Sequence, residues 1–96
     1  MRTDDRVAAT GIASRFGENL VRCRRRARYS QEELSVLAGL HRTEIGVLER
    51  GERLPRLDTL VKLAGGLEVE SSELLEGLLW RPGQERVGSF EVGDRQ

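Results

Sequence analysis

The sequence has only one cysteine, Cys23, so the chain cannot form an internal disulfide or a zinc site built from several cysteines. No apolar run approaches the roughly 20 residues that a membrane-spanning helix needs. The N-terminus carries two aspartates where a secretory signal would carry a hydrophobic segment. At 96 residues the chain has room for one compact domain. We therefore expect a cytoplasmic protein without a membrane segment, which acts through a single module.

Catalysis has no candidate residues in this sequence. No Ser-His-Asp, Cys-His, paired-carboxylate or phosphate-loop arrangement is visible, and the lone histidine, His41, is no metal site. Aromatic residues make up 4% of the chain, which disfavours RNA binding by base stacking. We expect no enzyme activity, no metal and no cofactor.

The formal net charge of zero hides an uneven distribution. Residues 14–67 hold eleven Arg or Lys against seven acids, a net charge of +4. Residues 68–96 hold three arginines against seven acids, a net charge of −4. The basic part can therefore face a polyanion while the acidic part lies elsewhere, although basic residues on a helix often form only a solvated face.

Apolar residues recur at helical spacing in five segments, which predicts an all-α domain. In the first segment, 14–28, the stripe is Phe16, Leu20, Cys23 and Ala27. The buried faces expected for the other segments are, in chain order, Leu34, Leu37 and Ala38; Ile45 and Leu48; Leu57, Leu60, Val61, Ala64 and Leu67; and Leu74, Leu75, Leu78 and Leu79. Because Cys23 falls on the first stripe, we expect it to be a small buried hydrophobe.

Two of these helices are separated by almost no chain. In SQEELSVLAGLHRTEIGVLERG, Ser30 can cap one helix and Gly39 ends it. The next helix runs from about Arg42 to Arg50, and Gly51 follows where the chain leaves with positive φ. Two helices joined by about three residues with a glycine at the bend form a helix-turn-helix, whose second helix is presented to the DNA major groove.

The two ends of the chain lack helical periodicity. We expect residues 1–13 to be a flexible arm, residues 14–80 to form the domain, and residues 81–96 to be an acidic tail. The tail contains a Pro-Gly turn signal and the segment SFEV, so it is either disordered or one short strand.

The segment FGENLVRCRRRARYSQEELSVLAGLHRTEIGVLERGERLPRLDTLVKLAGGL closely resembles the lambda-repressor-like helix-turn-helix family, the Cro or xenobiotic-response-element type of regulator. The resemblance covers about residues 16–79, and SQEEL, the turn glycine and ERG are its most specific parts. It implies a compact five-helix domain that binds double-stranded DNA in a sequence-specific way. Such regulators usually act as homodimers that repress or activate a promoter.

The resemblance also implies roles for individual residues. The positions that approach base edges match Arg42, Thr43, Glu44, Gly46 and Val47. Arg42 is the strongest candidate to contact a guanine, and Glu44 either accepts from a cytosine or orients Arg42. The positions that contact phosphates match Gln31, His41, Arg50, Arg53 and Arg56. Arg24 and Glu49 match a structural ion pair between the first and third helices.

Gly46 and Val47 depart from the polar residues usual at these positions. One interpretation is that they narrow the readout to thymine methyl groups, with Gly46 letting the backbone approach closely. The other is that Arg42 and Thr43 dominate the reading.

The end of the fifth segment carries more apolar residues than one small core requires. Our hypothesis is that Leu78, Leu79 and Trp80 meet their copies across a two-fold axis. The alternative is that SFEV folds back and covers Trp80 within one monomer.

Two functions remain open at this point. The first is a complete regulator, such as the controller of a restriction-modification operon, which binds a palindromic operator as a homodimer. The second is an antitoxin-like interaction module. In that case Trp80, Phe90 and Val92 bind a partner protein through a tail that orders on binding, while the helix-turn-helix autoregulates its operon.

Overall fold

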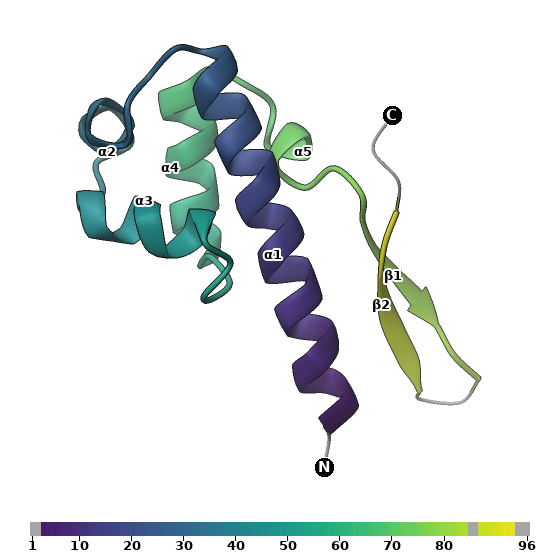
Figure 1. Ribbon diagram of the computed structural model, residues 1–96. Helices are drawn as coiled ribbons and strands as arrows, with labels where there is room; N and C mark the ends of the chain where they lie inside the picture. The colour runs from purple at the N-terminus through teal and green to yellow at the C-terminus, as the bar shows by residue number, and fades with distance from the viewer. Residues whose placement is uncertain (1–2, 85–86, 94–96) are drawn as a thin grey trace.

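The structure is a computed structural model that describes residues 3–84 and 87–93 (Figure 1). The elements in this part of the chain are α1 (Thr3–Arg26), α2 (Gln31–Ala38), α3 (Arg42–Glu49), α4 (Leu57–Leu67), α5 (Ser71–Leu74), β1 (Leu78–Pro82) and β2 (Gly88–Val92). The five predicted helices are present. The all-α prediction is wrong for the last part of the chain, because β1 and β2 pair as an antiparallel hairpin.

The long helix α1 is the element around which the others are arranged. Figure 1 shows α2, α3 and α4 gathered on one side of α1, with the hairpin on the other side. Helix α1 contacts α3, α5 and both strands, while α2 packs against α3 and α4. The hairpin therefore lies apart from the pair formed by α2 and α3.

One hydrophobic core joins all five helices. Its fully buried large side chains are Phe16, Leu20, Leu34, Ile45, Leu48, Leu63 and Leu74. Cys23 is buried among them, as predicted, and burial raises the pKa of its thiol. The stripes read from the sequence therefore found most of this core.

Helix α4 buries only part of the predicted face. Leu60, Ala64 and Leu67 are buried, as predicted. Leu57 is 77% exposed, and Val61 is exposed as well, whereas Leu63 is fully buried. Leu37 of α2 was also predicted to be buried and is exposed. Both short helices are rich in apolar residues, so periodicity alone admits more than one rotation of the helix, and the packing of α2 against α4 selects one.

Helix α1 begins at Thr3, which differs from the flexible arm expected for residues 1–13. Ile12 and Ala13 are buried. Ile12 precedes Phe16 by four residues, so it continues the apolar stripe by one further turn. The predicted start of the helix at residue 14 is therefore too late.

The predicted fifth helix ends at Leu74, well before Leu78 and Leu79, which lie in β1. Asn19 of α1 explains the early end. Its side chain is fully buried, and Nδ2 donates to the carbonyl oxygens of Leu74 and Glu76, both at 2.9 Å. These bonds satisfy carbonyls that a longer helix would have used internally, so the chain can turn into the hairpin. This role of Asn19 was not among the predictions from the sequence.

The hairpin brings Trp80 and Phe90 together. Trp80 pairs with Phe90 across the ladder, and their ring centroids are 4.9 Å apart at an interplanar angle of 71°. This edge-to-face arrangement is favourable for aromatic pairs. The interpretation in which SFEV folds back onto Trp80 within one monomer therefore describes this structure, although 55% of Trp80 remains exposed.

Gly17 permits the close approach of α1 to α3, and replacing it should destabilise the fold. A Cβ atom at this position would lie 2.6 Å from the backbone oxygens of both Leu48 and Glu49. We expect Gly17→Ala to lower the free energy of unfolding by about 1–3 kcal/mol, because the rigid backbone of α3 must shift. Gly65→Ala is the matched control. It has nothing within 4 Å, and it should raise stability by roughly 0.5–1 kcal/mol. Thermal unfolding followed by circular dichroism measures both, and equal effects of the two substitutions would contradict the assignment.

Candidate nucleic-acid interface

Local hydrogen bonds build the sharp turn between α2 and α3. Ser30 caps α2 in a reciprocal box, in which its Oγ accepts from the Glu33 amide at 3.0 Å and its own amide donates to Glu33 Oε1 at 2.7 Å. Gly39 ends α2 in the left-handed region at φ 67°, as predicted. The following Leu40 amide donates to the Ser35 carbonyl at 2.9 Å. Three residues, 39–41, therefore separate the two helices.

His41 occupies the N-cap position of α3. Its Nδ1 accepts a hydrogen bond from the Thr43 amide at 3.1 Å. A ring nitrogen that accepts carries no hydrogen, so in the neutral ring the hydrogen is on Nε2. The side chain is exposed, and Nε2 can donate to an anion at the start of α3.

Arg24 and Glu49 form the ion pair that the resemblance implied. Arg24 Nε and Nη2 donate to the two oxygens of Glu49 at 2.5 and 3.0 Å, and the two side chains are 12% and 6% exposed. The hydrogen bond to Glu49 raises the pKa of Arg24. Arg24 Nη1 also donates to the Tyr29 carbonyl at 2.9 Å, and Gln31 Nε2 donates to Glu49 Oε1 at 2.9 Å. One charged cluster therefore ties α1, α2, α3 and the loop after α1 together.

Gln31, predicted to contact a phosphate, is thus partly engaged within the protein. The amide nitrogen of Gln31 carries two hydrogens, and Glu49 accepts one of them. The second remains available for an acceptor outside the protein. The ion pair consequently fixes where this amide lies at the start of α2.

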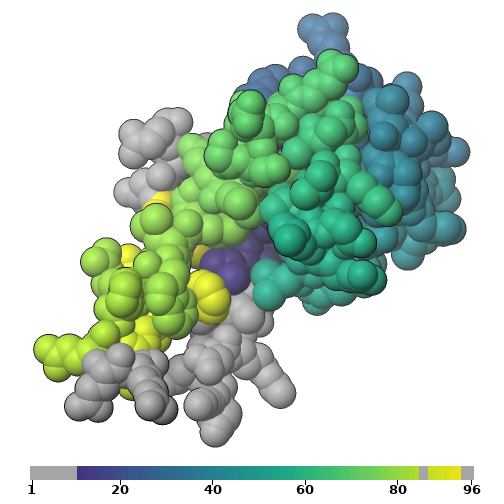
Figure 2. Space-filling view, turned by 180° about the vertical axis from the view of Figure 1, so that it is seen from behind, coloured from purple at the N-terminus to yellow at the C-terminus, as the bar shows by residue number. Residues whose placement is uncertain are grey.

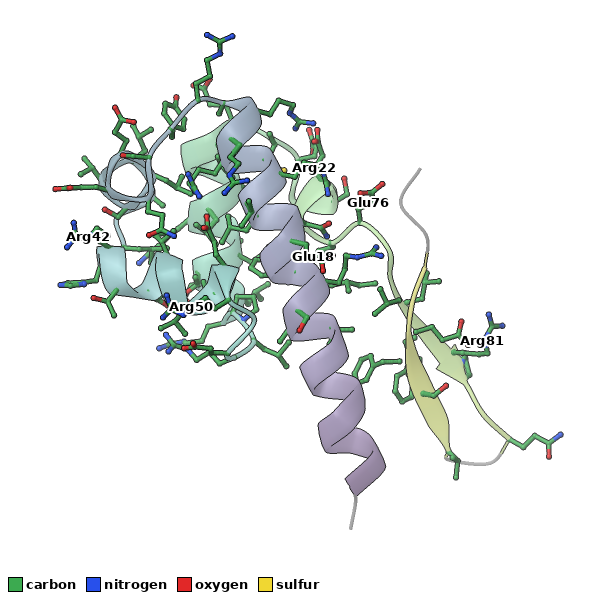
Figure 3. The ribbon with its side chains drawn as sticks, in the orientation of Figure 1. Glu18, Arg22, Arg42, Arg50, Glu76 and Arg81 are labelled. Carbon is green, nitrogen blue, oxygen red and sulfur yellow. The ribbon has the colours of Figure 1, made fainter. Side chains whose placement is uncertain are left out.

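The outward face of α3 differs in one respect from the predicted set of base contacts. Arg42 and Thr43 are exposed and Val47 is partly exposed, but Gly46 is buried. The guanidinium of Arg50 covers Gly46, with Nη1 3.0 Å from the position that a Cβ would take. The predicted close approach of the Gly46 backbone to a base is therefore blocked in this conformation. Figure 3 shows Arg42 and Arg50 at the two ends of α3.

Glu44 does not orient Arg42, which corrects one of the two roles considered for it. Its Oε2 lies 3.4 Å from Arg53 Nη2 and accepts from Thr59 Oγ1 at 3.4 Å. Arg42 instead lies 3.5 Å from Glu32 of α2. The side chain of Glu44 therefore connects α3 to the following loop and to α4.

Each of the four exposed arginines predicted to face DNA lies near a carboxylate. The pairs are Arg42 with Glu32, Arg50 with Glu52, Arg53 with Glu44, and Arg56 with Asp58. Hydrogen bonds from Arg50 lower the pKa of Glu52, so this carboxylate stays ionised near neutral pH. Ion pairs at exposed positions are weak, so a phosphate can replace the carboxylate at modest cost.

The three residues predicted to form the dimer interface do not share one surface. Leu78 lines an apolar groove together with Ile12, Phe16, Leu54, Pro55, Leu57, Leu60 and Leu75. Leu79 and Trp80 are exposed on the hairpin, and their side chains point to opposite faces because neighbours in a strand alternate. Figure 2 shows α1 in purple at the bottom of the recess between the hairpin and the α3–α4 region.

Residues 3–84 and 87–93, which the structure describes, contain neither a membrane-spanning helix nor a metal-binding cluster. None of the helices in these residues is both long enough and apolar enough to span a bilayer. Within the same residues, no three His, Cys, Asp or Glu side chains are grouped so that they could hold a metal ion.

A helix-turn-helix module consists of a short helix joined by a tight turn to a second helix, which carries exposed polar residues. Helices α2 and α3 have this arrangement. The chain belongs to the helix-turn-helix family, which matches residues 20–74. The prediction of a DNA-binding regulator with this motif is therefore confirmed.

Several relatives carry the description of control proteins. The chain is 39% identical over 72 residues to the control protein C.SmaI of Serratia marcescens, which covers 75% of this chain and 86% of that protein. It is 37% identical over 62 residues to the control protein C.BamHI of Bacillus amyloliquefaciens, covering 64% and 76% of the two chains. The crystal structure of the restriction-modification controller protein C.AhdI from Aeromonas hydrophila is similar at a TM-score of 0.63 and 40% identity, over 65% of this chain and 94% of that chain. These relatives favour a regulator over the antitoxin-like alternative.

Removing Arg24 should lower stability before it affects DNA binding directly. Arg24→Ala leaves the buried carboxylate of Glu49 without its charge partner, and we expect a loss of about 3 kcal/mol in the free energy of unfolding. Arg26→Ala is the control, because it removes the same charge from an exposed pair with Glu73 and should leave the melting temperature almost unchanged. Chemical denaturation measures both variants. An unchanged midpoint for Arg24→Ala would contradict a structural role for the pair.

Proposed function

We propose that this chain is a transcriptional controller that binds a palindromic DNA operator as a homodimer, with α3 of each copy in the major groove. The observation that carries the proposal is the exposed N-terminal end of α3, where Arg42 and Thr43 project from a helix held by the turn and by the buried Arg24–Glu49 pair. Residues at this end of a recognition helix contact base edges in helix-turn-helix proteins. The similarity to control proteins supports the same function.

The residues of α3 divide into different chemical roles. Arg42 can donate two hydrogen bonds to O6 and N7 of a guanine once it leaves Glu32, its weak exposed partner. Thr43 can hydrogen-bond a base or place its methyl against a thymine, and Val47 offers only an apolar contact. Glu44 keeps its proposed contact with a cytosine amino group only if it gives up Arg53 and Thr59.

Residues that can contact phosphates lie around the base-contacting residues of α3. The second amide hydrogen of Gln31 and the Nε2 hydrogen of His41 lie at the starts of α2 and α3, where helix dipoles favour anions. Arg53 and Arg56 follow α3 in the loop and are well exposed. Such contacts position the protein on the duplex and supply salt-dependent affinity.

The homodimer requires an apolar surface, and the structure offers one near α4. Leu54, Leu57, Val61 and Leu75 are exposed, and three of them line the groove that also contains Leu78. We propose that this set, rather than Leu79 and Trp80, forms the centre of the interface. Contiguous exposed apolar side chains of this kind mark interaction sites.

The antitoxin-like alternative required a tail that orders only on binding a partner. Residues Gly88–Val92 form a strand with Leu78–Pro82 in the isolated chain, so the aromatic residues already have partners within the chain. A protein partner for the hairpin is therefore the less supported function.

Selection of binding sites from a random pool of DNA duplexes tests the function. We expect a palindromic site, and we expect Arg42→Ala to relax the preference at one base pair in each half-site by roughly 5- to 150-fold. Arg81→Ala on the hairpin removes the same charge far from α3 and should leave the site unchanged (Figure 3). If no sequence is enriched from the pool at either low or high salt, the proposal is wrong.

Sedimentation equilibrium at micromolar concentrations tests the dimer surface. The double variant Leu57→Ser/Val61→Ser should weaken self-association by tenfold or more, because both side chains are exposed in the monomer and neither supports the core. Val36→Ser, an equally exposed apolar position on α2, is the control and should associate as the unmodified chain does. If the unmodified chain stays monomeric both free and on its operator, the dimer is wrong. If only Leu79→Ser disrupts it, the hairpin is the interface instead.

A further inference from the structure

The exposed stripe of α3 extends to its last turn. Thr43, Val47 and Arg50 are spaced by four and three residues, so their side chains leave the same side of the helix. Arg50 follows Thr43 by seven positions, which corresponds to about 10 Å along the helix axis. A side chain at position 50 can therefore meet a base pair about three steps away from the one that Thr43 meets.

Gly46 decides where the guanidinium of Arg50 lies. It sits on the same stripe, one turn before Arg50, and leaves open the space that any side chain would fill. The guanidinium occupies this space, with Nη1 at 3.0 Å, Cζ at 3.8 Å and Nη2 at 3.9 Å from the Cβ position of Gly46. Arg50 thus lies back along the side of α3 that is proposed to face the groove.

Glu52 holds Arg50 in this position through one edge of the guanidinium. Arg50 Nε donates to Oε2 at 2.7 Å, and Nη2 lies 3.5 Å from Oε1. The backbone of Glu52 is itself fixed to α3, because its amide donates to the Val47 carbonyl at 3.1 Å. The remaining edge consists of Nη1 and the second hydrogen of Nη2, and among the described residues the structure shows no acceptor for Nη1. This is the edge with which an arginine donates two hydrogen bonds to a guanine.

We propose that Arg50 is a second base-reading residue, which recognises a guanine through its Nη1–Nη2 edge, and that Glu52 is the positioning residue that orients it. The proposal rests on the proposed DNA-binding function and changes the role of Arg50 from a phosphate contact to a base contact. The half-site then contains two recognised guanines, one for Arg42 and one for Arg50.

The charge of Glu52 supports this assignment. A carboxylate near the C-terminal end of a helix interacts unfavourably with the negative end of the helix dipole. Beside DNA it also repels the phosphates. Arg56, by contrast, has an 82% exposed side chain that lies beside Asp58. A residue that costs affinity but orients a guanidinium contributes to specificity, because the ordered side chain presents one donor pattern.

The test measures the binding of the unmodified chain and of three variants to the selected operator, to operators changed at each single base pair, and to unrelated duplex DNA. For Arg50→Ala we expect discrimination at one guanine of each half-site to fall by roughly 5- to 150-fold, with the preference at the Arg42 position retained. For Glu52→Ala we expect reduced discrimination at the same guanine, while affinity for unrelated DNA is unchanged or higher because a negative charge has been removed. Arg56→Ala is the phosphate control, and it should weaken all sequences alike and reduce the salt slope by about one.

The combined variant Arg50→Ala/Glu52→Ala completes the cycle. If Glu52 acts only through Arg50, adding Glu52→Ala to Arg50→Ala should cause no further loss of discrimination at that guanine. Glu52→Gln retains an oxygen that can accept from Arg50 and should keep part of the preference. Both positions are exposed, so circular dichroism should show unchanged folding for every variant.

Three results separate failure of this inference from failure of the function. If the unmodified chain enriches an operator and Arg50→Ala weakens every sequence uniformly, Arg50 is a phosphate contact and the inference is wrong while the function stands. If Glu52→Ala only raises affinity and keeps all base preferences, Glu52 has no positioning role. If the unmodified chain enriches no sequence, the DNA-reading function fails and this inference fails with it.

Discussion

The buried pair between Arg24 and Glu49 is the interaction on which the DNA-facing part of the structure depends. It joins the end of α1 to the end of α3, and it also receives Gln31 from the start of α2. Because a charged pair with so little exposure is stable only when its hydrogen bonds are satisfied, the three helices can adopt few other arrangements around it. Gly17 adds a second constraint, since its missing side chain lets the backbones of α1 and α3 touch. The angle at which α3 is presented follows from these two contacts.

Polar side chains of α1 hold the opposite side of the molecule as well. Asn19 binds the carbonyls at the end of α5, and Arg22 Nη1 donates to Asn19 Oδ1 at 2.9 Å, which fixes the orientation of the amide. The hairpin begins where these hydrogen bonds end the helix. A single long helix therefore positions the reading helix on one side and the aromatic hairpin on the other. This arrangement keeps the hairpin apart from α3 (Figure 1).

The surface that we propose to face DNA carries little net charge. Its exposed arginines each have a carboxylate nearby in the free protein, so phosphates must compete with protein groups for them. This competition lowers the affinity for DNA of any sequence, because an arginine that contacts a phosphate must give up its ion pair with the carboxylate. A guanidinium already oriented by a carboxylate loses less conformational freedom when it meets a guanine. The acidic residues that dilute the basic charge are thus compatible with a protein that must distinguish its site from a large excess of other sequences.

The sequence by itself determined the turn, the caps and most of the core. Ser30, Gly39 and Gly51 act through hydrogen bonds and dihedral angles within a few residues, so their roles can be read locally. Only the tertiary structure decided which face α4 buries, where Glu44 points and how Arg50 covers Gly46. It also decided that the predicted fifth helix ends early, because the groups that end it come from Asn19, far away in the sequence. Periodicity and capping report on neighbours along the chain, whereas these features depend on which distant side chains and backbones meet in space.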